Sequence, residues 1–222
     1  MVIEPFINRE FTPLAPDDSV ATAIARMDAW RSETLPVVEP TTGKVIGQIK
    51  LEQLVEVEQE SSPVSGLELT PAVTLHARQH VFEATRTLLM HEVRFITVVD
   101  REEKCLGILE KEKMMEVLTG YLNVTVQGSE ITVEMDTKDY TLAEIVHLIE
   151  SENARILGIA VEAPANQADP FLVSCKLNVR DSSAISQSLR RHGYTVRSES
   201  RSDLLHVDMA DRADELMRYL DV

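Results

Sequence analysis

Histidines and acidic residues are the first candidates for chemistry in this 222-residue chain. His76 and His80 lie four residues apart, a metal-like spacing, but they should straddle a loop and a helix start with no third ligand nearby. His147 falls on the partly polar side of a predicted helix, close to Glu144, as surface histidines often do. No nucleophile, base and orienting partner occur together, so the sequence predicts neither catalytic residues nor a metal site.

Composition and charge narrow the possible classes of protein. Cys105 and Cys175 both sit inside apolar strand patterns, which indicates buried, reduced thiols. The N-terminus has neither a basic region nor an apolar run, and no apolar segment reaches the ~20 residues that cross a bilayer. We therefore expect a cytoplasmic protein with no membrane partner. The net charge of −15 makes an acidic surface that repels phosphate backbones, so nucleic acid is not an expected partner.

A tandem repeat organises the first half of the chain. Residues 34–49 and 94–109 share one pattern of strand, acidic turn and strand. Upstream of both, five apolar positions recur at a constant spacing of 61 residues, and Gly47 and Gly107 then match after a one-residue shift. The matched positions are Leu14, Val20, Ala23, Met27 and Val38 in the first copy and Leu75, Val81, Ala84, Leu88 and Val99 in the second. Such a repeat predicts one supersecondary unit built twice, each copy burying its apolar face with the help of the other.

Each copy resembles a CBS domain. The first shows Leu14-x-Pro-Asp-Asp-x-Val-x-x-Ala23, an amphipathic helix to Met27, Leu35-Pro-Val-Val-Glu39 and Gly43-Lys-x-x-Gly47. We place one repeat at residues 1–62 and the other at 63–122, with a closing helix that ends near Gly120. The pair resembles a Bateman module. In that family the module usually binds an adenine nucleotide or a related anion in the cleft between the repeats.

The resemblance also implies where such a ligand would bind. Nucleotide-binding members place a Ser or Thr after the last strand and, three residues on, an Asp that pairs with the ribose hydroxyls. These positions hold Lys50 and Gln53 in one copy and Glu110 and Lys113 in the other, so the ribose-binding Asp positions are absent. The two lysines either meet a phosphate or carboxylate or are surface lysines at helix starts. The candidate cleft residues are Thr34, Lys50, Thr74, Phe95 and Lys113, and no cofactor is certain.

The pattern changes after the second copy. Strands are expected near 131–135, 156–161, 171–179 and 194–197, with helices from Leu142 and near Ile185. This βαββαβ order is that of ferredoxin-like folds, so the whole chain is predicted to be α+β. The words Leu142-Ala-Glu-Ile145 and Glu152-Asn-Ala-Arg-Ile-Leu-Gly-Ile159 resemble an ACT domain over 123–200. A CBS pair followed by an ACT-like domain is the architecture of acetoin-utilisation-type proteins, and residues 201–222 are expected to form a strand and helix extension.

ACT domains that bind amino acids commonly have a Gly in the loop before the first helix. Tyr140 stands at that position, where it either stacks on a ligand or fills the emptied pocket. The candidate ligand residues in this loop are Thr137, Asp139 and Tyr140, while Asp139 or Thr141 also suits a helix N-cap.

Two functions remain open on the sequence. The first is a non-catalytic sensor that binds a small metabolite or nucleotide-like ligand, in the CBS cleft or at the ACT interface, and modulates an unknown partner enzyme. The second is a ligand-free dimerisation or interaction subunit whose ligand sites have decayed. Both module types usually pair, so either function predicts a homodimer.

Overall fold

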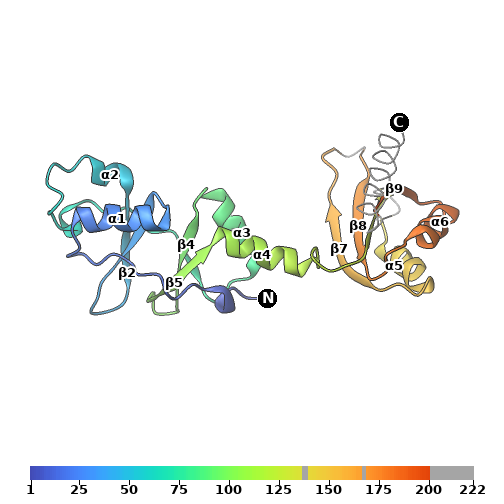
Figure 1. Ribbon diagram of the computed structural model, residues 1–222, viewed down its shortest axis with the longest axis horizontal. Helices are drawn as coiled ribbons and strands as arrows, with labels where there is room; N and C mark the ends of the chain where they lie inside the picture. The colour runs from blue at the N-terminus through green and yellow to red at the C-terminus, as the bar shows by residue number, and fades with distance from the viewer. Residues whose placement is uncertain (137–139, 167–168, 201–222) are drawn as a thin grey trace, which may run out of the picture. The chain divides into compact units, whose positions relative to one another are not determined.

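A computed structural model describes residues 1–136, 140–166 and 169–200, and it has the α+β class expected from the sequence (Figure 1). The chain divides into two compact units, the first covering Met1–Val117 and the second beginning at Leu118. The predicted extension at 201–222 lies outside the described residues.

The first unit contains the two copies, each built around an antiparallel hairpin with a helix before it and another after it. The first copy consists of α1 (Val20–Trp30), β1 (Thr34–Val38), β2 (Val45–Lys50) and α2 (Leu51–Val55). The second consists of β3 (Thr74–His76), α3 (Val81–Met90), β4 (Phe95–Val99), β5 (Cys105–Glu110) and α4 (Lys111–Tyr121). Two 3₁₀ turns, η1 (Glu4–Phe6) and η2 (Val64–Gly66), lie in the segments that precede the copies.

The two copies agree in backbone detail, which confirms the repeat read from the sequence. All five matched apolar pairs are buried, at most 9% exposed. Arg31 and Glu92, 61 residues apart, both adopt a left-handed conformation after the first helix of their copy, with φ of 47° and 53°. The pairing of each hairpin shifts at the same place, between Val37 and Val38 in one copy and one repeat later in the other.

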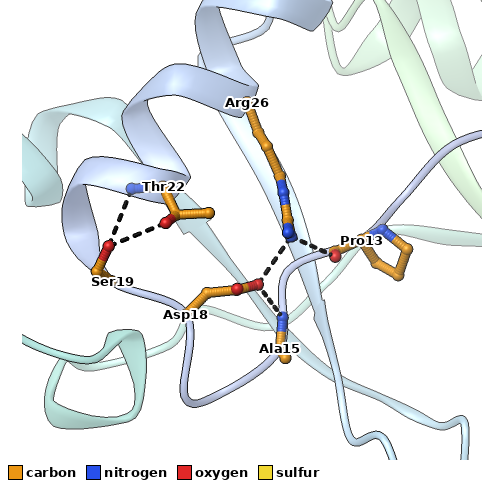
Figure 2. Close-up of polar contacts among 6 residues, drawn as sticks. All are labelled: Pro13, Ala15, Asp18, Ser19, Thr22 and Arg26. Carbon is orange, nitrogen blue, oxygen red and sulfur yellow. Dashed lines mark hydrogen bonds and ion pairs between the residues drawn. The ribbon is translucent and has the colours of Figure 1, made fainter.

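Polar side chains hold the start of α1 in place (Figure 2). The Oγ of Ser19 accepts the Thr22 N–H at 3.2 Å, which caps the helix. One Asp18 carboxylate oxygen accepts both the Ala15 N–H at 2.8 Å and the Arg26 guanidinium at 2.7 Å. The same Arg26 nitrogen also donates to the carbonyl of Pro13 at 2.8 Å. The loop before α1 is thereby tied to the helix.

The second copy repeats this arrangement with different residues. The Gln79 side-chain oxygen Oε1 accepts the His76 N–H at 2.9 Å, one repeat after Asp18 and Ala15. The Nδ1 of His80 accepts the Phe82 N–H at 3.3 Å and caps α3 where Ser19 caps α1. The His80 side chain therefore serves the backbone at the start of α3, whereas the His76 side chain lies 3.8 Å from the Glu103 carboxylate.

Each copy is completed at one edge by the segment that precedes the other copy. Asn8 pairs antiparallel with Ile108 of β5, and Thr70 pairs antiparallel with Gln48 of β2. Ile3 is fully buried in the core of the second copy, together with residues of α3, β4 and β5. The first residues of the chain thus pack with the second copy, and the two copies exchange edges.

The second unit has the βαββαβ order predicted from the sequence. Its elements are β6 (Ser129–Met135), α5 (Leu142–Ser151), β7 (Ile156–Glu162), β8 (Phe171–Leu177), α6 (Ser183–Arg191) and β9 (Thr195–Ser200). The strands are ordered β7-β8-β6-β9 and all neighbours are antiparallel, which is the ferredoxin-like topology. Alternate residues of β6 and β8, such as Val133 and Val173, are buried with Ile145 and Ile149 of α5.

The helix that closes the second copy ends near Gly120, as predicted. Helix α4 continues through Gly120 to Tyr121, and the left-handed residue that follows is Asn123, with φ of 53°. Asparagine tolerates this conformation better than most residues. Its side-chain amide also donates to the carbonyl of Leu157 at 2.7 Å, which holds the chain in place at the entry to the second unit.

Candidate ligand-binding cleft

A cavity of about 1010 Å³ lies between the two copies of the first unit. It is bordered by the segments that begin β1 and β4, by the end of β2 and by the first residues of α2. Because both copies contribute, a molecule in this cavity touches both. The lining includes Arg31, Ser32, Glu33, Thr34, Pro36, Gln48, Lys50, Leu51, Glu52, Val55, Val73, His91, Glu92, Val93, Arg94, Phe95, Ile96 and Thr97.

Three of the five predicted cleft residues line the cavity, namely Thr34, Lys50 and Phe95. Thr74 lies in β3 opposite Thr97 of β4 and is not among the lining residues, although its neighbour Val73 is. Lys113 lies on exposed α4 and forms an ion pair with Glu116, at 2.7 Å, rather than lining the cavity.

Charged side chains and apolar side chains both line the cavity. The ammonium of Lys50 lies 3.3 Å from Glu52, and the guanidinium of Arg94 lies 2.8 Å from Glu112. Arg31 has no ion pair with the part of the chain that the structure describes. Apolar surface comes from side chains such as those of Leu51 and Val55. Glu33, Glu52 and Glu92 also line the cavity, so it holds as many carboxylates as lysine and arginine side chains. A small anion with an apolar group would be held by the cationic side chains and the apolar surface.

Gln53, which stands where family members place the ribose-binding Asp, makes hydrogen bonds within the protein. The Gln53 side-chain oxygen accepts the Lys50 N–H at 3.0 Å, and the amide nitrogen donates to the carbonyl of Glu68 at 2.7 Å. Gln53 therefore caps the start of α2 and ties it to the segment between the copies. This residue already has both of its polar atoms paired, so it offers little to a sugar diol.

Sequence reasoning missed the part played by the first residues of the chain. Phe11 is 6% exposed, and its ring lies 5.1 Å from that of Trp30 and 5.3 Å from that of Phe95. The side-chain amide of Asn8 donates to the Glu110 carboxylate at 2.8 Å. The repeat pattern that we used begins only at Leu14, so it gave no reason to place these residues beside the second copy.

A second cavity, of about 760 Å³, lies in the second unit. Tyr140 lines it and packs against Phe171, with ring centroids 4.6 Å apart. The Tyr194 hydroxyl donates to the Glu144 carboxylate at 2.6 Å, and Glu134 lies 3.3 Å from Arg197. The other predicted residues of this loop, Thr137 and Asp139, lie outside the described residues.

Cys175 is buried, as predicted, whereas Cys105 is only half-buried. Cys175 is 1% exposed in β8, and desolvation raises its pKa to about 11. Desolvation also raises the pKa of the half-buried Cys105. Within residues 1–136, 140–166 and 169–200, no group of three or more histidine, cysteine or acidic side chains is arranged to hold a metal ion. Over the same residues no helix has the length and apolar character to span a membrane.

Comparison with known proteins gives one family match and several matches to solved structures. A family model described as the CBS domain matches residues 3–60 and 64–120, more than half of the chain. A CBS domain pair/ACT domain protein from Thermotoga maritima is 20% identical with a TM-score of 0.48, over 55% of this chain and 99% of that chain. The CBS domains of a transcriptional regulator from Streptococcus pneumoniae are 15% identical with a TM-score of 0.46, over 52% and 98%. CBSX2 in complex with AMP is 20% identical with a TM-score of 0.45, over 54% and 96%.

Proposed function

This chain belongs to the CBS-domain family, and we propose that it is a non-catalytic regulatory protein that binds a small anionic metabolite, such as an adenine nucleotide, in the cleft between its repeats. Proteins of this family are generally regulatory and bind nucleotides such as AMP or ATP. The second unit, which has the ferredoxin-like topology, is proposed to be an ACT-like regulatory domain. The bound state would then modulate a partner enzyme.

One observation carries this proposal: the cavity is lined by both repeats and brings Lys50 and Arg31 beside an apolar wall. A ligand that touches both repeats stabilises one arrangement of them over others. Only 1–3 kcal/mol of differential binding is needed to couple two sites to a useful extent. The cleft therefore has the chemistry and the position that a regulatory ligand requires.

The test is a stability screen of purified, ligand-free protein against AMP, ATP, inorganic phosphate and a set of amino acids. Trp30 is the only tryptophan and lies in the first unit, so its fluorescence reports the unfolding of the CBS pair. A compound at 100 times its dissociation constant should add about 2.7 kcal/mol to the free energy of unfolding.

Two lysine variants locate the binding. Lys50→Ala should weaken binding by roughly tenfold, because a hydrogen bond to a charged group contributes about 1.5–3 kcal/mol. Lys113→Ala is the matched control, since both lysine side chains are 47% exposed and ion-paired but only Lys50 lines the cavity. Equal effects of the two variants would place the ligand elsewhere, and no response to any compound would favour the second candidate below.

The second candidate is an interaction subunit with decayed ligand sites. It is favoured by the internal pairing of the cleft groups, since Gln53, Lys50 and Arg94 all bond to other groups of the chain. Exposed apolar side chains on α3, such as Leu89 at 57% and Met90 at 69%, offer a surface for association. Both candidates include a homodimer. Light scattering that gave the monomer mass in the micromolar range would contradict this part of the proposal.

A further inference from the structure

The cavity between the repeats extends to one side only. The segments after α1 and α3 are equivalent in the two copies, and both border it. Beyond them, the cavity continues along residues of β2 and α2 in the first copy. The first-copy residues that line this part are Gln48, Lys50, Leu51, Glu52 and Val55, and the equivalent residues that do not line it are Ile108, Glu110, Lys111, Glu112 and Met115.

We call the side of the cavity that is lined by Lys50 and Leu51 the open side. An aromatic cluster fills the equivalent space in the other copy. Phe11 packs on Trp30 and Phe95, and the rings of Trp30 and Phe95 are 6.4 Å apart. The repeat places Thr34 at the position of Phe95 and His91 at the position of Trp30. Phe11 corresponds to Ala72 or Val73 in the other copy, and both of these side chains are much smaller than that of Phe11. One side therefore has the three rings of Phe11, Trp30 and Phe95, whereas the equivalent positions of the other side hold one ring, that of His91.

The segment that carries Phe11 is anchored beside Glu110, the equivalent of Lys50. The Asn8 amide donates to the Glu110 carboxylate, and the Asn8 backbone exchanges hydrogen bonds with Ile108 at 2.8 and 3.0 Å. The carboxylate that a ligand on this side would meet is thus already bonded within the chain. Its negative charge also opposes the binding of an anion, whereas Lys50 on the open side favours it.

We infer that residues 8–11 are an internal plug, so that this CBS pair has one ligand site per chain in place of two equivalent sites. The inference rests on the proposed function in one respect. It takes the open side as the site that binds a small anion with an apolar group. Phe11 is the residue that closes the other side. The chain itself supplies the occupant of that second site.

A first experiment needs no ligand. Trp30 is the only tryptophan of the chain, so acrylamide quenching of its fluorescence measures access to the plugged side. A large-to-small substitution leaves a cavity, so Phe11→Ala should raise the quenching constant about twofold. Phe11→Leu keeps a buried apolar group and should raise it less. Circular dichroism confirms that each variant is folded, and Phe11→Leu provides the measurement if Phe11→Ala is not.

A matched experiment moves the tryptophan to the open side of the cavity. In a Trp30→Phe, His91→Trp protein the indole occupies the equivalent position, and adding Thr34→Phe should lower its quenching about twofold, because the new ring takes up space there. An unchanged quenching constant in both folded Phe11 variants would overturn the inference, whatever the ligand.

A second experiment counts sites with AMP as the probe, by equilibrium dialysis. We expect one AMP per chain in the unmodified protein, at least about tenfold weaker binding in Thr34→Phe, where the ring blocks the site, and a second, weaker site in Phe11→Ala. Two equal sites in the unmodified protein would overturn the inference. If AMP does not bind at all, adenine nucleotides are rejected as the ligand of the proposed function, while the quenching results still decide whether the plug exists.

Discussion

The backbone of Lys44 lies opposite that of Lys104 in an isolated antiparallel bridge. On either side of it, the Cys105 N–H donates to the Gly43 carbonyl at 2.8 Å and the Val45 N–H donates to the Glu103 carbonyl at 3.3 Å. Every partner in this set is matched by its counterpart in the other copy. Exchanging the copies exchanges the two hydrogen bonds, so the bridge marks the local symmetry between the repeats.

The turns beside this bridge give a matched pair of substitutions. Gly43 and Glu103 are equivalent, and both have positive φ, of 70° and 63°. Gly43→Ala should lower the free energy of unfolding by about 1 kcal/mol, because a side chain in the left-handed region is strained. Glu103→Ala should stay within about 0.5 kcal/mol, since that residue already has a Cβ atom there. Urea unfolding followed by Trp30 fluorescence measures both, and equal losses would refute the explanation from φ.

A methyl group at Gly107 should displace the first residues of the chain. A Cβ atom there would lie 2.2 Å from the carbonyl oxygen of Asn8, and φ is +134°. We expect Gly107→Ala to cost more than about 2 kcal/mol, because overpacking and backbone strain act together. Gly66→Ala is the control, because no atom lies within 4 Å of its added Cβ. Limited proteolysis should cut near residue 8 faster in Gly107→Ala alone.

We expect Asp18 to contribute more to the free energy of unfolding than an exposed ion pair of similar length does. Asp18→Ala removes both the bond to the Ala15 N–H and that to Arg26, and should cost about 1–3 kcal/mol. Breaking the Lys113–Glu116 pair with Lys113→Ala should cost at most about 0.5 kcal/mol, since exposed pairs contribute little. The midpoints of thermal unfolding of the two variants test this order, and a larger effect of Lys113→Ala would reverse the conclusion.

The Cys175 thiol should make the second unit less stable in alkali. Its pKa in the folded chain is raised to about 11 from the usual 9.0, so the neutral thiol is the form that the fold favours. This contribution is complete below pH 9 and is lost as the pH rises towards 11, by roughly 2–3 kcal/mol in all.

The unfolding of the second unit is the transition that circular dichroism detects and Trp30 fluorescence does not. Its dependence on pH is followed between pH 8 and 10.5. Cys175→Val keeps an apolar group in β8 and should flatten the dependence in this range. A variant that kept the full alkaline loss would assign it to another group.

The repeat made the first unit predictable from Leu14 onwards. Apolar residues at matched positions report burial directly, so the pairs such as Val20 with Val81 located α1 and α3 correctly. The alternation of Ile131, Val133 and Met135 likewise located β6. Gly120 marked the end of α4 to within one residue, although the left-handed residue there is Asn123.

The cleft was predictable only in part. Thr34, Lys50 and Phe95 were predicted from the resemblance to CBS domains, and each lies at the end of a strand. Arg31 and Arg94 line it as well, although Arg94 is only the first residue of the repeated stretch 94–109 and neither arginine was predicted as a ligand residue. Asn8 and Phe11 act through contacts with residues about 100 and 84 positions away, and single-sequence patterns carry no information about such distant pairings.

The exchange of edges between the copies has a consequence for synthesis on the ribosome. Residues near Asn8 emerge before β5, their pairing partner, which is made about 100 residues later. Until then the start of the chain has no strand to join, and β2 likewise waits for Thr70. Neither copy can reach its final state cotranslationally on its own, so the pair should mature in a single step once Glu110 has left the exit tunnel.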